Sequence, residues 1–296
     1  MRTDHETARV PSTMNDAAGL LRASPLPALE ARILLGHVLG WRRTELITRS
    51  DEPLARDQVA RYHALEARRI AGEPVAQLVG AREFFGLEFE VTPDVLIPRP
   101  ETELLVETAL AALDGLSRPS VLDLGTGTGA IAVALASARP DARVWAVDRS
   151  AEALDVAGRN AARLLDPQRP GGPVQFTRSD WYAALDSALR FDVIVSNPPY
   201  IASGDPHLVE GDLRFEPRGA LTDEADGLSA IRAIIAGAPA RFEAARGGVL
   251  WLEHGYDQAA AVRALLSERG FAAVRSAEDL AGIERISGGT WLPEGA

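Results

Sequence analysis

The sequence contains no cysteine and no lysine, since all 31 of its basic residues are arginine. Without cysteine the chain forms no disulfide bond and uses no thiolate chemistry. Without lysine it forms no Schiff base and lacks the lysine of a phosphate-binding P-loop. The five histidines are scattered, with no pair at metal-ligand spacing, so we expect no zinc or iron site.

Long apolar runs and a positive charge balance are missing as well. The start, MRTDHETARV, has no apolar core, so we do not expect a signal peptide there. Apolar runs such as 129–138 are too short to cross a bilayer. A formal net charge of −11 argues against broad, sequence-independent binding to nucleic acid. We therefore expect a cytoplasmic protein that contacts neither a membrane nor nucleic acid directly.

The N-terminal part of the chain has the pattern of a small helical bundle. Apolar residues recur at helical spacing in the segments 17–23, 28–39 and 54–70. From residue 84 the pattern changes to the alternation of a strand or hairpin, up to residue 91, and a proline-rich connector follows over 92–100. We predict three parts: a helical, substrate-binding domain at 1–82, the hairpin and connector at 83–100, and a catalytic domain at 101–296.

The remaining chain alternates between strand and helix patterns. Strands are predicted at 120–124, 143–147, 174–177, 191–196, 249–253 and 271–275, and helices at 101–113, 130–138, 151–165, 227–236 and 258–268. Such alternation indicates an α/β fold with a mainly parallel sheet covered on both faces. Ligands of these sheets bind outside the carboxyl ends of the strands.

A glycine loop stands directly between a predicted strand and a predicted helix, in VLDLGTGTGAI at 121–131. Gly125, Gly127 and Ala130 formally satisfy the dinucleotide-binding fingerprint, which permits a terminal alanine. Asp148 ends the next strand, where a carboxylate would bind ribose hydroxyls. These features alone fit either a nicotinamide enzyme or an adenosylmethionine enzyme, and a purely structural turn is a third interpretation.

Asp123 bears on that choice because it lies two residues before the glycine loop. A carboxylate at this place disfavours a pyrophosphate, since both groups are anionic. It suits a ligand that carries an ammonium and a sulfonium group and no phosphate. S-adenosylmethionine, with S-adenosylhomocysteine as its product, is such a ligand.

The stretch Asn197-Pro198-Pro199-Tyr200 follows the predicted strand at 191–196. Proline ends a strand and restricts the residue before it, so the stretch is either a rigid turn or a fixed polar clamp. As a clamp, the Asn197 carboxamide oxygen and the Pro198 carbonyl would each accept one N–H of a substrate –NH₂ group. This arrangement orients the nitrogen for methyl transfer and supports the positive charge that develops on it, while Tyr200 offers a flat face to a planar group.

Other segments are more specific than the glycine loop and the clamp, which many methyltransferases share. The most telling are LIPRPETE at 96–103 and RFEP at 214–217. Together with GEPVAQLVG at 72–80 and LEHG at 252–255, they resemble the peptide chain release factor glutamine methyltransferases, the PrmC/HemK family. The likeness covers nearly the whole chain, although the ending at 283–291 departs a little from the family's usual close.

The resemblance implies a class I, Rossmann-like methyltransferase fold with a seven-stranded sheet, a helical N-terminal domain and a hairpin connector. The reaction it implies is methylation of the side-chain amide nitrogen of the glutamine in the Gly-Gly-Gln loop of bacterial class 1 release factors. It also implies that the N-terminal bundle helps to grip this protein substrate. Preference between release factors and the oligomeric state stay open, with a monomer favoured.

The family pattern also implies roles for individual residues. The cofactor is expected to be lined by Gly125, Thr126, Gly127, Thr128 and Gly129, with Asp148 on the ribose, Trp181 beside the adenine, and Asn197 contacting both methyl donor and acceptor. The target glutamine is expected to lie within Asn197, Pro198, Pro199 and Tyr200, near Phe84, Arg99 and Glu101. Three alternatives stand beside these roles: Phe84 and Trp181 are core residues, and Arg99 and Glu101 form a structural ion pair.

Two functions of other classes compete with this one. An adenine-N6 methyltransferase acting on DNA or RNA would use the same clamp on the exocyclic amine of a flipped base. A non-catalytic scaffold or nicotinamide-binding module would use the glycine loop without the clamp. The acidic charge balance counts against the first rival.

Overall fold

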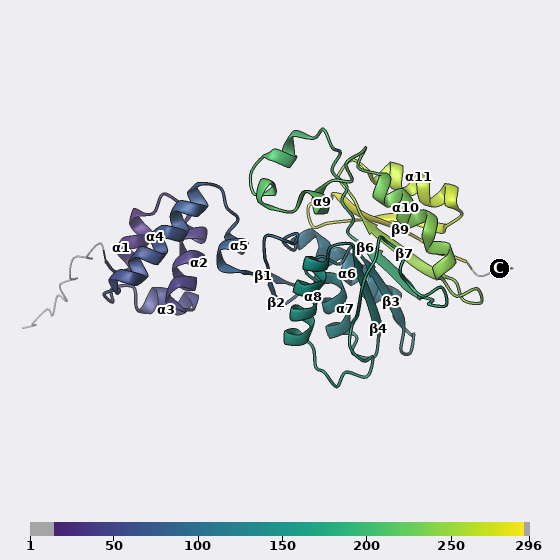
Figure 1. The fold of residues 1–296 in the computed structure, drawn as a ribbon, viewed down its shortest axis with the longest axis horizontal. Coiled ribbons are helices and arrows are strands. Elements are labelled where there is room, and N and C mark those ends of the chain that lie inside the picture. Colours follow the sequence, from purple (N-terminus) through teal and green to yellow (C-terminus); the bar gives the residue numbers. More distant parts are fainter. Residues whose placement is uncertain (1–14, 293–296) are drawn as a thin grey trace, which may run out of the picture. The chain divides into compact units, whose positions relative to one another are not determined.

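The computed structural model describes residues 15–292 and divides into two compact units, Met1–Val79 and Gly80–Ala296 (Figure 1). The segment MRTDHETARV, for which no signal peptide is expected, lies outside the described residues. Within residues 15–292, no helix is both long enough and apolar enough to cross a membrane.

The first unit is helical. Its described helices are α1 (Ala17–Ala23), α2 (Ala28–Leu39), α3 (Arg43–Thr48), α4 (Arg56–Ile70) and α5 (Val75–Val79). The Asp16 carboxylate caps α1 by accepting the Gly19 N–H at 2.7 Å, as expected for an acidic N-cap residue. Leu34, Leu35 and Tyr62 are fully buried between the helices and form the centre of the core. The short helices α3 and α5 were not predicted, because neither is long enough to show a helical period.

A hairpin opens the second unit. Its strands β1 (Ala81–Phe84) and β2 (Leu87–Glu90) pair antiparallel, with Phe84 opposite Leu87. Phe85 and Gly86 both have positive φ, 52° and 74°, which is the backbone of the tight turns that suit hairpins. The alternating pattern was expected from residue 84 and the hairpin part of the chain from residue 83, whereas β1 begins at Ala81. The side chains of Arg82 and Glu83 are both exposed, so β1 lacks the apolar alternation that marks a half-buried strand.

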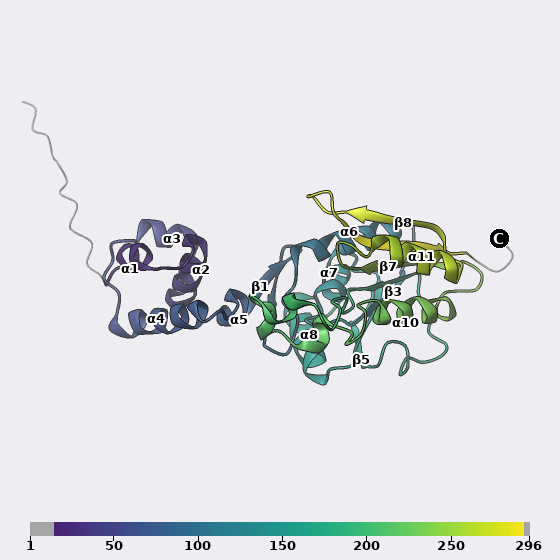
Figure 2. The ribbon, with the colours of Figure 1, turned by 90° about the horizontal axis from the view of Figure 1, so that it is seen from above.

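The second unit contains a seven-stranded sheet in the order β5-β4-β3-β6-β7-β9-β8. Its strands are β3 (Ser120–Leu124), β4 (Arg143–Asp148), β5 (Gln175–Arg178), β6 (Val193–Ser196), β7 (Gly248–Glu253), β8 (Ala272–Glu278) and β9 (Glu284–Trp291). Strands β3 to β7 pair with one another in parallel, whereas β9 runs antiparallel to both β7 and β8. Figure 2 shows β5 and β8 at opposite edges. The predicted class I methyltransferase fold is confirmed.

Helices cover both faces of the sheet (Figure 1). On one face lie α6 (Glu103–Ala112), α7 (Ala130–Ala138) and α8 (Ala151–Leu164), and on the other lie α10 (Ser229–Gly237) and α11 (Ala259–Arg269). The strands β3 and β6 are buried along their whole length, as expected for central strands of a parallel sheet. The core therefore holds the carboxyl ends of β3, β4 and β6 in fixed positions next to one another.

The last strand, β9, was not predicted from periodicity; only the family resemblance implied a seventh strand. Its centre contains Gly288 and Gly289, and glycine inside a strand weakens the apolar alternation from which a strand is predicted. The structure explains Gly288, because a Cβ at this position would lie 2.4 Å from the Leu250 carbonyl oxygen and 2.4 Å from the Trp251 ring. The glycine thus permits the close approach of β9 to β7.

Candidate active site

A cavity of about 260 Å³ lies at the carboxyl ends of β3, β4 and β6. Six of the predicted site residues line it: Gly125, Gly127, Asp148, Trp181, Asn197 and Pro199. Two segments that sequence reasoning did not place there also line it. They are residues 94–96 of the connector, and Pro217, Gly219 and Ala220 around the short helix α9 (Arg218–Leu221). The cavity is therefore bounded by the strand ends and by two loops far apart in the sequence.

The glycine loop turns sharply at the end of β3. The N–H groups of Gly125 and Thr126 both donate to the Val147 carbonyl of β4, at 2.8 and 3.0 Å. Gly125 and Gly127 have φ values of 73° and 54°, in the left-handed region that favours glycine. A Cβ on Gly127 would meet no atom within 4 Å, so the bare backbone at this position leaves open space where a ligand can approach closely.

The other three loop residues predicted to line the cofactor do not line the cavity. Gly129 is the N-cap residue of α7 with a φ of 80°, and a Cβ there would lie 3.1 Å from the Ala157 Cβ of α8. Thr126 and Thr128 are buried, and the Thr126 hydroxyl donates to Asp123. These residues shape the loop and pack its helix, which is the role that the third glycine has in related folds.

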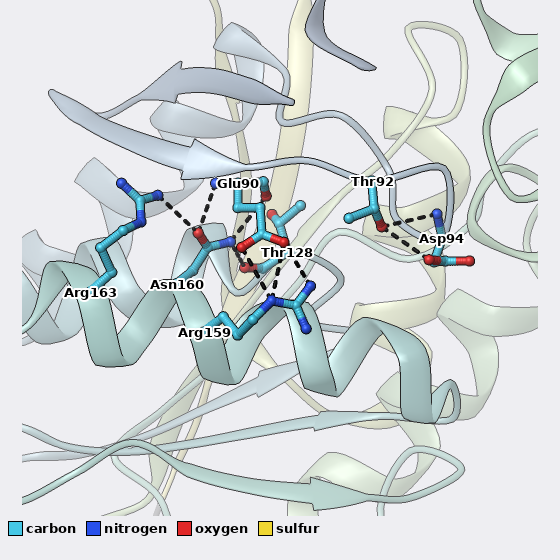
Figure 3. Close-up of polar contacts among 7 residues, drawn as sticks. All are labelled: Glu90, Thr92, Asp94, Thr128, Arg159, Asn160 and Arg163. Atoms are coloured by element: carbon cyan, nitrogen blue, oxygen red, sulfur yellow. Dashed lines mark hydrogen bonds and ion pairs between the residues drawn. The ribbon is translucent and has the colours of Figure 1, made fainter. Parts of the chain in front are cut away.

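Asn160 connects the glycine loop to the hairpin (Figure 3). This asparagine is fully buried on α8, where its Oδ1 accepts the Glu90 N–H at 2.7 Å. Its Nδ2 donates to the Glu90 carbonyl at 3.1 Å and to the Thr128 carbonyl at 3.0 Å. Sequence reasoning missed Asn160, although its spacing from the buried Ala153 and Val156 puts an amide on the apolar face of the helix.

Asp148 lies at the end of β4 with both carboxylate oxygens engaged. Its Oδ2 accepts the Gly127 N–H at 2.9 Å, and its Oδ1 accepts the Ser150 N–H at 3.0 Å. Each oxygen retains further acceptor capacity. The side chain is thus fixed at the cavity wall in a form that can accept two hydroxyl hydrogens.

The charged side chains around the cavity are mainly acidic. Asp94, Asp148 and Asp180 line it, against a single guanidinium, that of Arg149. Arg149 in turn donates to the Gly219 carbonyl at 3.1 Å. A cation is favoured in such surroundings, and a ligand with a doubly charged pyrophosphate is disfavoured.

Asp123 is placed differently from the expectation that it faces the ligand. Its side chain is fully buried and does not line the cavity; Oδ2 accepts the Thr126 hydroxyl at 2.6 Å, while Oδ1 has no partner among the described residues. Burial raises the pKa of the Asp123 carboxyl from 3.8 to about 7. Near neutral pH the group is partly protonated, so the case against a pyrophosphate rests on the lining residues rather than on Asp123.

We expect Asp123→Asn to change how stability depends on pH. Between pH 3.8 and about 7 the folded protein holds a proton on Asp123 that the unfolded chain has released. The free energy of unfolding therefore falls as the pH rises through this window, by up to about 1.4 kcal/mol per pH unit. A carboxamide at this position does not titrate, so the variant should lose this slope and be the more stable protein at pH 8.

Urea denaturation of both proteins from pH 5 to 8, without added ligand, measures the effect. Glu253, whose pKa is also raised to about 7, titrates in both proteins and cancels in the comparison. Parallel stability curves for the two proteins would show that Asp123 is already ionised in the folded state at low pH.

Trp181 lines the cavity and also packs against the core cluster under α10. The core interpretation thus describes part of this side chain, and its position at the cavity leaves the expected place beside the adenine as a prediction. Its backbone has a φ of 47°, which is unusual for a bulky residue, and the Ser179 hydroxyl donates to its carbonyl at 2.8 Å. An ideal Cβ on Gly125 would lie 3.6 Å from the indole, so the ring stands next to the glycine loop.

The Asn197 side chain is held by a residue that sequence reasoning did not single out. Asn197 Nδ2 donates to the Thr102 hydroxyl at 3.1 Å, and Oδ1 accepts no hydrogen bond from residues 15–292. Pro198 is buried, Pro199 lines the cavity, and the Tyr200 hydroxyl lies 3.5 Å from Glu253 Oε1. The amide oxygen at the cavity is thus available as an acceptor, as the clamp interpretation requires.

The alternative interpretation, in which Arg99 and Glu101 form a structural ion pair, does not hold in the structure. Arg99 pairs with Glu216, a buried residue of the RFEP segment. Glu216 Oε2 also accepts the Ile97 N–H at 2.9 Å. Glu101 is exposed and lies close enough to Tyr200 and Glu253 for its charge to raise the pKa of each.

Phe84 is a core residue in this structure. Its side chain is 1% exposed and contacts Phe89 in an edge-to-face arrangement with ring centroids 6.0 Å apart. The family pattern suggested a place for Phe84 near the substrate, but the structure favours the alternative interpretation, in which the ring packs the hairpin onto the rest of the second unit.

Comparison with known proteins identifies two matching family models. The PrmC N-terminal domain matches residues 13–80, and the methyltransferase small domain matches residues 100–210. The first covers the helical unit, and the second covers the glycine loop, Asp148 and Asn197.

Curated relatives match over most of the chain. A release factor glutamine methyltransferase of Burkholderia pseudomallei is 74% identical over 273 residues, 92% of this chain and 95% of that protein. One from Bordetella pertussis is 57% identical over 270 residues, 91% of this chain and 97% of that protein.

Two solved structures are similar to this chain, and the first of them shows the same fold. The catalytic domain of hMettl16, in complex with an untranslated-region hairpin, is similar with a TM-score of 0.55 at 17% identity, over 78% of this chain and 83% of that one. A protein-(glutamine-N5) methyltransferase (release factor-specific) from Alicyclobacillus acidocaldarius is 35% identical, over 69% of this chain and all of that one, with a TM-score of 0.41.

Proposed function

The chain belongs to the release factor glutamine methyltransferase family, and from this premise we propose that its substrate is the glutamine of the Gly-Gly-Gln loop in class 1 peptide chain release factors. The enzyme is a protein-glutamine N-methyltransferase. Methyl transfer from S-adenosylmethionine to the side-chain amide nitrogen leaves S-adenosylhomocysteine as the second product.

The assignment depends on one observation. An acceptor oxygen that has no hydrogen-bond partner among residues 15–292 lies at the wall of an acid-lined cavity. The Asn197 amide lines the same cavity as the glycine loop and Asp148. A methyl donor and an –NH₂ acceptor have to meet at such a place, because transfer requires the two reacting groups to be aligned and close.

The cavity residues fit the proposed cofactor. Asp148 would accept the ribose hydroxyls, Trp181 would lie against the adenine, and the open backbone at Gly127 would admit the ligand closely. The acidic lining favours the net positive charge of the donor. When bound, the donor supplies an electrophilic methyl group on a sulfonium.

The clamp residues would act on the target amide. Asn197 Oδ1 and the Pro198 carbonyl would each accept one N–H of the glutamine side chain, and Tyr200 would stack on its planar amide. These acceptors would orient the nitrogen and stabilise the positive charge that forms on it. No strong base is needed at this step, because the N–H becomes acidic as the methyl group arrives.

The first experiment separates this function from an adenine methyltransferase. The protein is incubated with donor labelled on the methyl group and with either a class 1 release factor, DNA or RNA. We expect label only in the release factor, on the glutamine of its Gly-Gly-Gln peptide, as read by mass spectrometry. Label in nucleic acid alone would overturn the proposal.

The second experiment tests the cofactor. A ligand that binds only the folded protein stabilises it, by about 2.7 kcal/mol at a hundredfold excess over its dissociation constant. We expect S-adenosylmethionine and S-adenosylhomocysteine to raise the melting temperature and NADH to leave it unchanged. Stabilisation by NADH alone would assign the glycine loop to a nicotinamide cofactor.

We expect Asp148→Ala to weaken cofactor binding by about 10- to 100-fold, since a hydrogen bond to a charged group contributes about 1.5–3 kcal/mol. The variant also frees the Gly127 and Ser150 N–H groups that Asp148 now binds. Calorimetry with S-adenosylhomocysteine measures the change. Asp155→Ala is the matched control, because Asp155 is exposed on the neighbouring helix α8. Equal affinities of the two variants for S-adenosylhomocysteine would show that Asp148 does not bind the cofactor.

A further inference from the structure

The clamp is held differently at its two ends. Its first residue, Asn197, directly follows β6, which is paired with β3 on one side and with β7 on the other. Its last residue, Tyr200, lies outside the strand, so other contacts have to fix it. The proposed function needs Tyr200 in place, because its ring is to stack on the target amide. The groups that hold Tyr200 therefore bear on the reaction.

One side chain, that of Gln258, binds the backbone of Tyr200. Gln258 is the partly buried N-cap residue of α11, in the loop that follows β7. Its Nε2 donates to the Tyr200 carbonyl at 3.0 Å and to the Gly227 carbonyl at 3.3 Å. Its Oε1 accepts the Gly255 N–H at 2.8 Å. These partners fix the orientation of the amide, because a carbonyl oxygen only accepts and a backbone N–H only donates.

The space around the Tyr200 carbonyl is tight. Gly227 has a φ of 80°, and a Cβ at this position would lie 2.4 Å from the Tyr200 carbonyl oxygen and 2.9 Å from Gln258 Nε2. Only glycine permits such a close approach of two backbone segments. The next residue, Ile201, donates its N–H to the Leu221 carbonyl at 3.0 Å. The amide of Gln258 thus joins the loop after β6 to the loops before α10 and after β7.

The Tyr200 ring is held less firmly than the Tyr200 backbone. The Tyr200 hydroxyl lies 3.5 Å from Glu253 Oε1, which is longer than usual for a hydrogen bond between two oxygens. The residue also packs, partly buried, against the core cluster under α10. The position of the ring therefore depends on where the backbone of Tyr200 is held.

We propose that Gln258 is a positioning residue for methyl transfer, which fixes the backbone of Tyr200 and with it the ring that stacks on the target amide. The proposal rests on the proposed function, since it assumes that Tyr200 stacks on the glutamine side chain. Gln258 does not line the cavity, and it acts through Tyr200 rather than on the cofactor. Its effect should therefore appear in the rate of methyl transfer and not in the affinity for the donor.

The first test is Gln258→Met. Methionine has about the length of glutamine and lacks the amide that binds the two carbonyls. We expect the single-turnover rate at saturating release factor to fall by about 10- to 100-fold, because a misplacement of about 1 Å at a reacting group can cost 100-fold. Calorimetry with S-adenosylhomocysteine should give the dissociation constant of the natural protein.

The second test is Gln258→Glu, measured as a function of pH. An ionised glutamate cannot donate to the Tyr200 carbonyl, whereas a protonated one can donate to it and still accept the Gly255 N–H. We expect the rate of Gln258→Glu relative to that of the natural protein to rise as the pH falls from about 8.5 to about 5.5, since neighbouring carbonyl oxygens favour the protonated form. The relative rate of Gln258→Met should not change with pH, because methionine gains no proton.

The matched control is Gln168→Glu, which makes the same chemical change on an exposed residue that does not line the cavity. This variant should keep the natural rate at every pH. Melting temperatures of all four proteins are measured at the same pH values, and rates are compared well below the lowest of them. The recovery of Gln258→Glu at low pH is read within one folded protein, so it separates positioning from a loss of fold.

Three results would overturn the proposal. The natural rate in Gln258→Met would show that Tyr200 is held without Gln258. A constant relative rate of Gln258→Glu across the pH range would show that a donor hydrogen at residue 258 does not matter. A loss of donor affinity as large as the loss of rate would show that Gln258 supports the cofactor cavity. Failure of the natural protein itself to methylate release factor while it binds the donor would instead reject the proposed function.

Discussion

Replacement of Asn197 by alanine is expected to lower kcat for methylation of the release factor by about 100- to 1,000-fold, the loss typical when one preorganised group that stabilises developing charge is removed. The physical reason is an acceptor oxygen that is available at the cavity wall, since Asn197 Oδ1 accepts no hydrogen bond from residues 15–292. Alanine leaves the substrate amide with one acceptor fewer and with freedom to rotate. Single-turnover methylation with labelled donor measures the rate.

The fold should survive this change. Asn197 is half-buried, and its one side-chain hydrogen bond within the described part of the chain is to the Thr102 hydroxyl. We therefore expect the melting temperature of Asn197→Ala to stay close to that of the natural protein, and the methyl donor to bind nearly as well. A variant that keeps more than about a tenth of the natural rate, against the expectation for charge-stabilising groups, would contradict the clamp mechanism.

Replacement of Phe84 by alanine is expected to lower the free energy of unfolding by about 3–5 kcal/mol, the usual cost of deleting a buried phenylalanine ring. Phe84 is 1% exposed and packs on Phe89, so the deletion leaves a cavity between the hairpin and the core. Phe84→Leu retains most of the volume and should cost about 1.5 kcal/mol or less. Urea denaturation of the three proteins gives the values.

The same variants separate the core role of Phe84 from the substrate role that the family pattern suggested. A core residue gives a graded loss of stability with little change in KM for the release factor, provided that the assay temperature is well below the melting temperature. If Phe84→Ala were as stable as the natural protein and raised KM strongly, the ring would contact the substrate, and the buried position would not describe the working enzyme.

The sequence predicted the parts of the site that follow from local patterns. Each of these parts depends only on residues that are neighbours in sequence. They are the glycine loop between a strand and a helix, the acid at the end of the next strand, and the Asn-Pro-Pro-Tyr turn after the fourth predicted strand. The structure places Gly125, Gly127, Asp148 and Asn197 around one cavity, because carboxyl ends of adjacent parallel strands meet at one edge of the sheet.

The residues that hold the site were not predictable in this way. Thr102 and Asn197 are 95 residues apart in sequence, and Asn160 and Glu90 are 70 apart. Glu216 is 119 residues from Ile97. No period or spacing encodes such contacts, which exist only once the chain has folded. The alternative pairing of Arg99 with Glu101 fails for the same reason, because the charge that lies nearest in space is Glu216, which is far from Arg99 in sequence.

Asp123 shows a different limit of prediction from sequence. Its place at the end of β3 was predicted correctly, but a strand end does not reveal whether a carboxyl group faces the ligand or the core. The structure buries Asp123 completely, and burial disfavours the charge on which the sequence argument depended. The position of a residue along the chain is therefore easier to predict than its ionisation state.

The amide of Asn160 has a mechanical consequence for the cofactor loop. The Asn160 side chain forms hydrogen bonds with the backbone of both Glu90 and Thr128. A displacement at the end of the hairpin is therefore expected to displace the turn that would bind the methyl donor. The hairpin and the turn therefore share one anchoring side chain. Substitutions in β2 should for this reason alter donor affinity even though no residue of β2 lines the cavity.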